Sequence, residues 1–148
     1  MGTENEVGVR KPGILVADDM ALILTLLKFE LESRGFDVWL AVDGDDALDL
    51  YGRHGSEIDL VLLDIEMPGL DGPHTLEALQ RLKPDVVACF MTENLDKYTN
   101  EELLDQGPAW IFRKPFKPAE VAERLKLLVP VPDPARPFCK FETPGQAR

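Results

Sequence analysis

Residues 60–72 read Leu60-Val61-Leu62-Leu63-Asp64-Ile65-Glu66-Met67-Pro68-Gly69-Leu70-Asp71-Gly72, and this stretch indicates the fold. Four apolar residues, enough for a short buried strand, lead into the carboxylate of Asp64, and a loop rich in Pro and Gly follows at once. A strand that ends in this way holds its last side chain at the rim of a sheet. Because ligands of parallel α/β sheets bind at the carboxyl ends of strands, Asp64 is the first candidate for chemistry.

Outward from this stretch, short apolar runs alternate with segments of helical spacing. The expected strands are residues 14–17, 38–41, 60–64, 86–91 and 110–113. The expected helices are residues 20–34, 45–51, 73–82, 100–106 and 118–128. Pro73 suits a first helical position, Asn100 is the expected N-cap of its helix, and Gly35 and Gly107 are stop signals. The alternation predicts an α/β fold, a doubly wound five-stranded parallel sheet with helices on both faces.

The length and the charge balance limit the class of protein. At 148 residues and 45% hydrophobic content we expect one domain, placed at residues 12–129, between an N-terminal tail (1–11) and a Pro-rich C-terminal tail (130–148). Sixteen Lys and Arg against 27 Asp and Glu give a net charge of -11, which argues against nucleic-acid and membrane partners. No apolar run approaches 18 residues, and residues 1–11 lack the apolar region of a signal peptide, so a cytoplasmic location is expected.

The C-terminal tail and the two cysteines carry weaker signals. Five prolines in residues 130–148 prevent a regular helix, so the tail is either disordered or a docking segment anchored by Phe138 and Phe141. Cys89 lies in an apolar run and Cys139 in the tail, without metal-ligand spacing, and we expect no disulfide between them.

Polar side chains follow four of the expected strands. Asp18 and Asp19 end the first, Asp64 the third, Thr92 the fourth and Lys114 the fifth. In a doubly wound sheet of order 2-1-3-4-5 the first and third strands are neighbours, so the three carboxylates converge. Their repulsion favours a hard divalent cation, and Mg²⁺ suits an oxygen site that retains waters for a phosphoryl group. The site has the parts to take a phosphoryl group on a carboxylate and to stabilise the added charge.

Over about residues 12–129 the chain resembles a two-component response-regulator receiver domain, which has the flavodoxin-like fold. Four segments carry the resemblance: Ile14-Leu15-Val16-Ala17-Asp18-Asp19, Asp64 with Met67-Pro68-Gly69-Leu70-Asp71-Gly72, Met91-Thr92-Glu93, and Lys114-Pro115-Phe116. Each alone is weak, but all four occur in order and each lies at a strand end.

This resemblance implies a role for each site residue. Asp64 accepts phosphate from a phosphohistidine of a histidine kinase or phosphotransfer protein. Asp19 binds Mg²⁺ directly, Asp18 does so directly or through water, and the backbone carbonyl of Glu66 supplies a further ligand beside Asp64 itself. Lys114 pairs with the aspartate or its phosphate. The hydroxyl of Thr92, the remaining site residue, hydrogen-bonds a phosphoryl oxygen.

Two positions depart from the family pattern. The residue three before Lys114 is usually Tyr, Phe or His, and here it is Ile111; Trp110 beside it points to the opposite face of the strand. The usual coupling between the hydroxyl and an aromatic ring is therefore in question. The residue after Thr92 is usually small, and here it is Glu93. We hypothesise that this carboxylate narrows the site and repels a phosphodonor, with slower phosphorylation, slower dephosphorylation or partner selectivity.

The same residues also have non-functional interpretations. Asp18 or Asp19 can simply cap the following helix. Thr92 can be an ordinary hydroxyl at a strand end, and Lys114 a solvated turn residue. His54 and His74 are expected to be exposed loop and helix residues, and no phosphodonor histidine stands out.

Three classes of function follow. The first, and favoured, is a stand-alone receiver that signals by protein contact, not an enzyme, with a downstream protein target and a possible homodimer through residues 100–106, 110–113 and 118–128. The second is a scaffold or pseudo-receiver that works without phosphorylation. The third is a phosphatase of the haloacid-dehalogenase type, which carries Asp two residues after the nucleophile, where this chain has Glu66.

Overall fold

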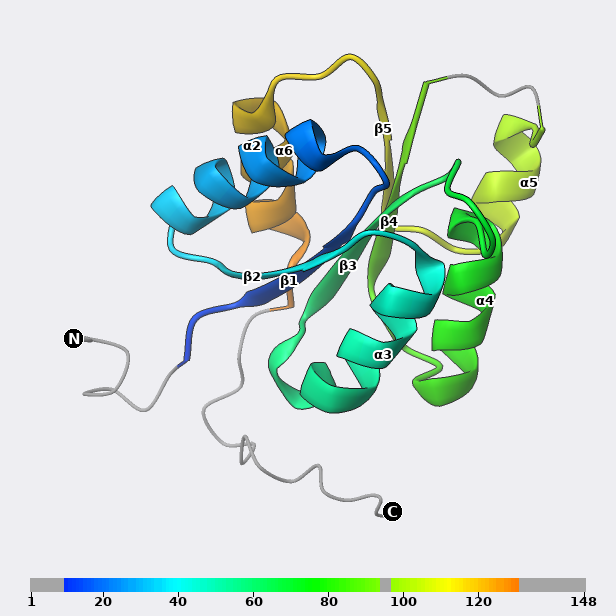
Figure 1. The fold of residues 1–148 in the computed structure, drawn as a ribbon, viewed down its shortest axis with the longest axis horizontal. Coiled ribbons are helices and arrows are strands. Elements are labelled where there is room, and N and C mark those ends of the chain that lie inside the picture. The colour runs from blue at the N-terminus through cyan, green and yellow to red at the C-terminus, as the bar shows by residue number, and fades with distance from the viewer. Residues whose placement is uncertain (1–9, 94–96, 131–148) are drawn as a thin grey trace.

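A twisted parallel sheet between two layers of helices forms the part of the chain that the computed structural model describes, residues 10–93 and 97–130 (Figure 1). The strands are β1 (Gly13–Ala17), β2 (Asp37–Ala41), β3 (Leu60–Asp64), β4 (Ala88–Thr92) and β5 (Trp110–Arg113). The helices are α2 (Ala21–Ser33), α3 (Gly44–His54), the 3₁₀ helix η1 (Gly55–Glu57), α4 (Gly72–Leu82), α5 (Asn100–Asp105) and α6 (Pro118–Leu128). All strands are parallel and lie in the order β2-β1-β3-β4-β5, as predicted.

The two faces of the sheet bury separate apolar clusters. Helices α2 and α6 cover one face, and α3, α4 and α5 cover the other (Figure 1). Along β3, Leu60 and Leu62 belong to the cluster under α2 and α6, while Val61 and Leu63 belong to the cluster on the opposite side. This alternation is the two-residue repeat of a strand covered on both faces, which explains why β3 reads as a continuous apolar run.

The strand register brings the predicted site residues to one edge of the sheet. Ala17 pairs with Leu63, Asp64 with Met91, and Thr92 with Arg113. The backbone continues this alignment past the strand ends, because the N–H of Lys114 donates to the carbonyl of Thr92 at 2.8 Å. The carboxyl ends of β1, β3, β4 and β5 therefore lie together.

The helices and strands begin within one residue of the sequence-based expectation, except for β4. The cap residue of α5 also differs from the expected one. Strand β4 begins at Ala88 rather than Val86, because the N–H of Val86 still closes a turn onto the carbonyl of Lys83 at 3.0 Å. The predicted N-cap Asn100 is wrong: Thr99 caps α5 and forms a capping box with Glu102. The Thr-x-x-Glu pattern carried this signal, and it places the cap one residue earlier.

The two cysteines and the C-terminal tail are only partly covered by the structure. The tail with Phe138, Phe141 and Cys139 lies outside the described residues. Cys89 is buried, with a free thiol whose pKa is raised to about 12 by burial. Helices in the described ranges lack the combination of length and apolar character that a membrane span requires.

Candidate functional site

Three carboxylates gather where β1 and β3 end. Asp18, Asp19 and Asp64 each offer an oxygen atom, and these atoms lie within 4.8 Å of one another. Asp18 is fully buried, Asp64 is 6% exposed and Asp19 is exposed. The group thus combines two carboxylates held by the sheet with one that reaches solvent.

The electrostatics of this cluster favour a cation. Burial, and next the negative charge of Asp18, raise the pKa of Asp64 from its ordinary value of 3.8 to about 7, although Lys114 acts in the opposite direction. A divalent cation would relieve this repulsion, and an all-oxygen donor set with one solvent-facing member suits Mg²⁺, which keeps part of its water shell. The residues present therefore fit Mg²⁺.

Lys114 connects the two buried carboxylates. Its ammonium nitrogen lies 2.8 Å from Oδ2 of Asp18 and 3.2 Å from Oδ1 of Asp64. Burial lowers the pKa of Lys114, but the hydrogen bond to Asp18 and the charges of both aspartates outweigh it and leave the pKa raised. With its side chain only 8% exposed, Lys114 is not the solvated turn residue of the non-functional interpretation.

Asp18 also takes part in the start of the following helix. Its Oδ1 accepts a hydrogen bond from the N–H of Met20 at 2.9 Å, while its Oδ2 faces Lys114. Met20 occupies the N-cap position of α2 without a side-chain cap bond. Asp18 therefore does not cap the first turn of α2: one oxygen closes a local turn with Met20, and the other belongs to the acidic site.

Thr92 and Glu66 complete the predicted set. Thr92 is 1% exposed at the end of β4, beside the pairing of Asp64 with Met91. Glu66 follows β3 by two residues, and its side chain is exposed. The loop after it turns back closely, because the N–H of Gly72 donates to the carbonyl of Ile65 at 3.0 Å.

A largely apolar cavity of about 410 Å³ opens beside Lys114. Its lining is Met20, Ile23, Glu93, Lys114, Pro115 and Phe116. Glu93 thus shares this cavity with Lys114, and its side chain is exposed, but Asp18, Asp19 and Asp64 do not line the cavity.

The two residues at the start of β5 face opposite ways, as predicted. Ile111 is half-buried and contacts the cluster under α3, α4 and α5. Trp110 is 41% exposed, and the guanidinium carbon of Arg124 in α6 lies 3.8 Å from the centre of its ring. The ring of Trp110 therefore does not take the place of the aromatic side chain that Ile111 replaces.

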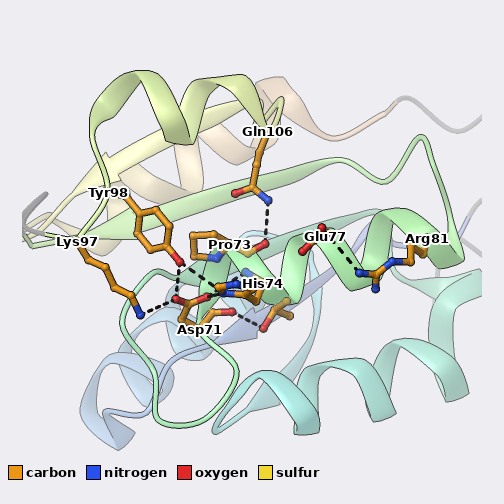
Figure 2. Close-up of polar contacts among 9 residues, drawn as sticks. Asp71, Pro73, His74, Glu77, Arg81, Lys97, Tyr98 and Gln106 are labelled. Carbon is orange, nitrogen blue, oxygen red and sulfur yellow. Dashed lines mark hydrogen bonds and ion pairs between the residues drawn. The ribbon is translucent and has the colours of Figure 1, made fainter.

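A second polar group lies at the start of α4, and the sequence patterns did not reveal it. Asp71, the N-cap of α4, is 5% exposed and bonded to His74, Lys97 and Tyr98 (Figure 2). The sequence carried a signal for the cap, because an Asp before a Gly-Pro pair is typical of a helix start. It carried no signal for the contacts with Lys97 and Tyr98.

The two histidines differ in their surroundings. His74 is exposed on α4 as expected. His54 is half-buried in α3, stacked on Trp39 with ring centroids 5.5 Å apart, so the expectation of an exposed loop residue was wrong. The aromatic partner comes from β2, which the local sequence around His54 does not indicate.

A doubly wound α/β domain with three carboxylates and a lysine at the carboxyl edge of its sheet has the architecture expected of a receiver domain. The family model of the response regulator receiver domain matches residues 14–126. The chain belongs to this family of two-component signalling proteins.

Curated relatives agree with this assignment. The transcriptional regulatory protein PrrA of Mycobacterium tuberculosis (strain ATCC 25618 / H37Rv) is 36% identical over 126 residues, 84% of this chain and 52% of PrrA. The alkaline phosphatase synthesis transcriptional regulatory protein PhoP of Bacillus subtilis (strain 168) is 37% identical over 119 residues, 78% of this chain and 48% of PhoP. The chain thus spans about half the length of these relatives.

Two solved structures have the same fold. A response regulator receiver domain from Clostridium thermocellum superposes with a TM-score of 0.69 at 28% identity. The match covers 80% of the present chain and 99% of the Clostridium chain. One chain of the CheX-CheY-BeF3-Mg+2 complex from Borrelia burgdorferi superposes with a TM-score of 0.75 at 26% identity. The match covers 85% of the present chain and 96% of the Borrelia chain.

Proposed function

We propose that this chain is the phosphoacceptor of a two-component or phosphorelay pathway and that Asp64 receives the phosphoryl group. The observation that carries the proposal is the position of Lys114, whose ammonium group bonds both Asp18 and Asp64 while Asp19 lies beside them. Nucleophile, cation ligands and a fixed positive charge thus meet at one point. The phosphodonor is a phosphohistidine of a histidine kinase or a phosphotransfer protein.

In the transfer, one carboxylate oxygen of Asp64 forms a bond to phosphorus as the phosphorus–nitrogen bond of the phosphohistidine breaks. The bonding electron pair stays on the imidazole nitrogen of the donor, and Asp64 becomes an aspartyl phosphate. Lys114 stabilises the charge added on the phosphoryl oxygens, and Thr92 supplies a hydroxyl donor to one of them.

Asp18, Asp19, Asp64 and the backbone carbonyl of Glu66 would hold Mg²⁺. When bound, Mg²⁺ supplies charge neutralisation for the phosphoryl oxygens. Asp18 has a further task, since its bond to Lys114 keeps that ammonium group directed at the reacting carboxylate.

The chain acts as the substrate of phosphotransfer rather than as a multiple-turnover enzyme, with slow loss of its own phosphate at most. Phosphorylation shifts a conformational equilibrium and alters the surface of α5, β5 and α6, which contacts a downstream protein target or a second copy of the chain. The absence of nucleic-acid and membrane partners, and the cytoplasmic location, stay predictions.

A second candidate is a scaffold that binds partners without phosphorylation. Two observations favour it: Ile111 stands in place of an aromatic side chain, and the carboxylate of Glu93 lines the cavity beside Lys114.

The test is incubation with Mg²⁺ and either acetyl phosphate or beryllofluoride, with Asp64→Asn as the control. With acetyl phosphate we expect the wild type to gain the mass of one phosphoryl group, and with either reagent we expect its amide spectrum to change. The variant should show neither effect. A silent wild type, also when a phosphorylated kinase or phosphotransfer protein is the donor, would support the scaffold instead.

A further inference from the structure

Asp71 fastens the start of α5 to the start of α4. One of its carboxylate oxygens, Oδ2, accepts from the hydroxyl of Tyr98 at 2.7 Å and from the ammonium group of Lys97 at 3.2 Å (Figure 2). The other, Oδ1, accepts from the backbone N–H of His74 at 3.0 Å and lies 2.7 Å from Nδ1 of the same residue. Both oxygens of a nearly buried carboxylate are thus engaged, and Tyr98 and Lys97 immediately precede Thr99, the N-cap of α5.

The far end of α5 is attached to the same helix. The side-chain amide of Gln106 donates to the carbonyl of Pro73 at 2.8 Å (Figure 2), and that of Gln80 donates to the carbonyl of Gln106 at 2.9 Å. A helix of six residues is too short to be stable by itself, so these contacts with α4 determine where α5 lies.

Asp71 is also tied to the phosphoacceptor through the backbone. A Cβ atom on Gly72 would lie 2.5 Å from the carbonyl oxygen of Asp64, so the two backbones are in direct contact. The β3–α4 loop therefore joins the reacting residue at one end to the acceptor of the Tyr98 hydroxyl at the other, and a shift of either backbone displaces its neighbour.

Tyr98 supplies an aromatic ring on the side of the sheet where Ile111 lacks one. Both side chains are half-buried and contact the same apolar cluster under α3, α4 and α5. Tyr98 adds a hydroxyl group bonded to a charged acceptor, and hydrogen bonds of this kind are stronger than those between neutral groups.

We propose that the hydrogen bond between Tyr98 and Asp71 couples phosphorylation of Asp64 to the position of α5. Tyr98 thereby takes the coupling role that an aromatic side chain at position 111 usually has in this family. The inference rests on the proposed function. The bond stabilises the arrangement with an unmodified Asp64, and phosphorylation favours an arrangement in which it is broken. Tyr98 is then a positioning residue. By linkage, weakening the bond makes phosphorylation, and the binding of a phosphoryl mimic, more favourable.

The experiment measures beryllofluoride affinity at saturating Mg²⁺ in the full chain, from the amide signals of α5. Tyr98→Phe removes the hydroxyl and keeps the ring. We expect it to bind beryllofluoride roughly tenfold to a hundredfold more tightly than the wild type, the range for loss of one hydrogen bond to a charged group. Asp71→Asn keeps a good N-cap for α4 but removes the charged acceptor of the Tyr98 hydroxyl and the ion pair with Lys97. Because both changes act on the bond between Tyr98 and Asp71, the double variant should gain less affinity than the sum of the two single variants.

Thr99→Ala is the matched control. It removes the capping box of α5 but leaves Asp71 and Tyr98 in place, so it should lower thermal stability without changing the affinity for beryllofluoride. An unchanged affinity in Tyr98→Phe, or an equal change in Thr99→Ala, would overturn the inference while the proposed function stands. A wild type that does not bind beryllofluoride would overturn the proposed function, and with it the coupling.

Discussion

Asp64 is a carboxylate in a location that disfavours its charge. Its burial and the nearby Asp18 raise its pKa to about 7. Between about pH 4 and pH 7 the carboxyl group is therefore protonated in the folded metal-free protein but ionised in the unfolded chain. Ionisation of the Asp64 carboxyl group therefore costs no folding stability below about pH 4. The cost grows as the pH rises and is complete above about pH 7.

Asp64→Asn should therefore stabilise the metal-free protein. We expect about 2 kcal/mol at pH 8, reduced from the full pKa shift because of solvent screening, and almost no difference from the wild type near pH 4. Urea unfolding at both pH values measures this. Added Mg²⁺ should stabilise the wild type much more than the variant. A variant that is less stable than the wild type at pH 8 would contradict this account.

Glu93 lines the cavity beside Lys114, and we expect its negative charge to repel an anionic phosphodonor. Replacement by Ala should speed phosphorylation by acetyl phosphate, an anionic donor, and change the rate of dephosphorylation, by about threefold to tenfold for the loss of one partly screened charge. Glu93→Gln keeps the size and removes the charge, so it separates repulsion from narrowing. Rates equal to those of the wild type in both variants, followed by mass spectrometry, would refute a role for Glu93.

At the scale of single elements, the first turn of α4 is tightly constrained by the site loop. Gly72 has no room for a side chain, because a Cβ atom would lie 2.5 Å from the carbonyl oxygen of Asp64 and 2.9 Å from the Cα of Ile65. Both neighbours are backbone atoms of the site loop, so they cannot turn away as a flexible side chain would.

Gly72→Ala should accordingly destabilise the fold by about 1–3 kcal/mol, the usual cost of overpacking, and weaken Mg²⁺ binding by displacing Asp64. Gly52 is the matched control. It lies within α3, and a Cβ atom added there would meet no neighbouring atom within 4 Å, so Gly52→Ala should stabilise the protein by about 0.5–1 kcal/mol. Thermal unfolding and Mg²⁺ titration of both variants measure these effects, and a harmless Gly72→Ala would show that the loop is free to move.

At the scale of the whole molecule, the surface of α5, β5 and α6 is where an output contact is expected. Trp110 is 41% exposed on β5 beneath the guanidinium group of Arg124, and Trp and Arg are enriched among the residues that dominate protein interfaces.

If this surface forms a homodimer, beryllofluoride and Mg²⁺ should increase the dimer fraction in sedimentation experiments. Trp110→Ser should weaken the dimer by about tenfold or more, as expected for an interface tryptophan. Phe29→Ser removes an apolar side chain, 75% exposed, from α2 and should have no such effect. Equal weakening by both variants would point to general loss of apolar surface rather than to this interface.

Local patterns were sufficient for the order of strands and helices and for the residues at the strand ends. A strand has a two-residue repeat and a definite end, so Asp18, Asp64, Thr92 and Lys114 could be placed at the carboxyl edge from the sequence. The cap of α5 was missed by one residue, although Thr99 and Glu102 carried the signal within four positions.

The contacts of Asp71 could not be found in this way. Tyr98 and Lys97 lie 27 and 26 residues further along the chain, and only the approach of two loops across the sheet edge brings them to the carboxylate. Periodicity reports which face of an element is buried, but not which loop residues meet. The fold class and the acidic site could therefore be predicted from the amino-acid order, because they depend on local repeats and on strand ends. The attachment of that site to α5 emerged only from the folded chain, because it depends on hydrogen bonds between distant segments.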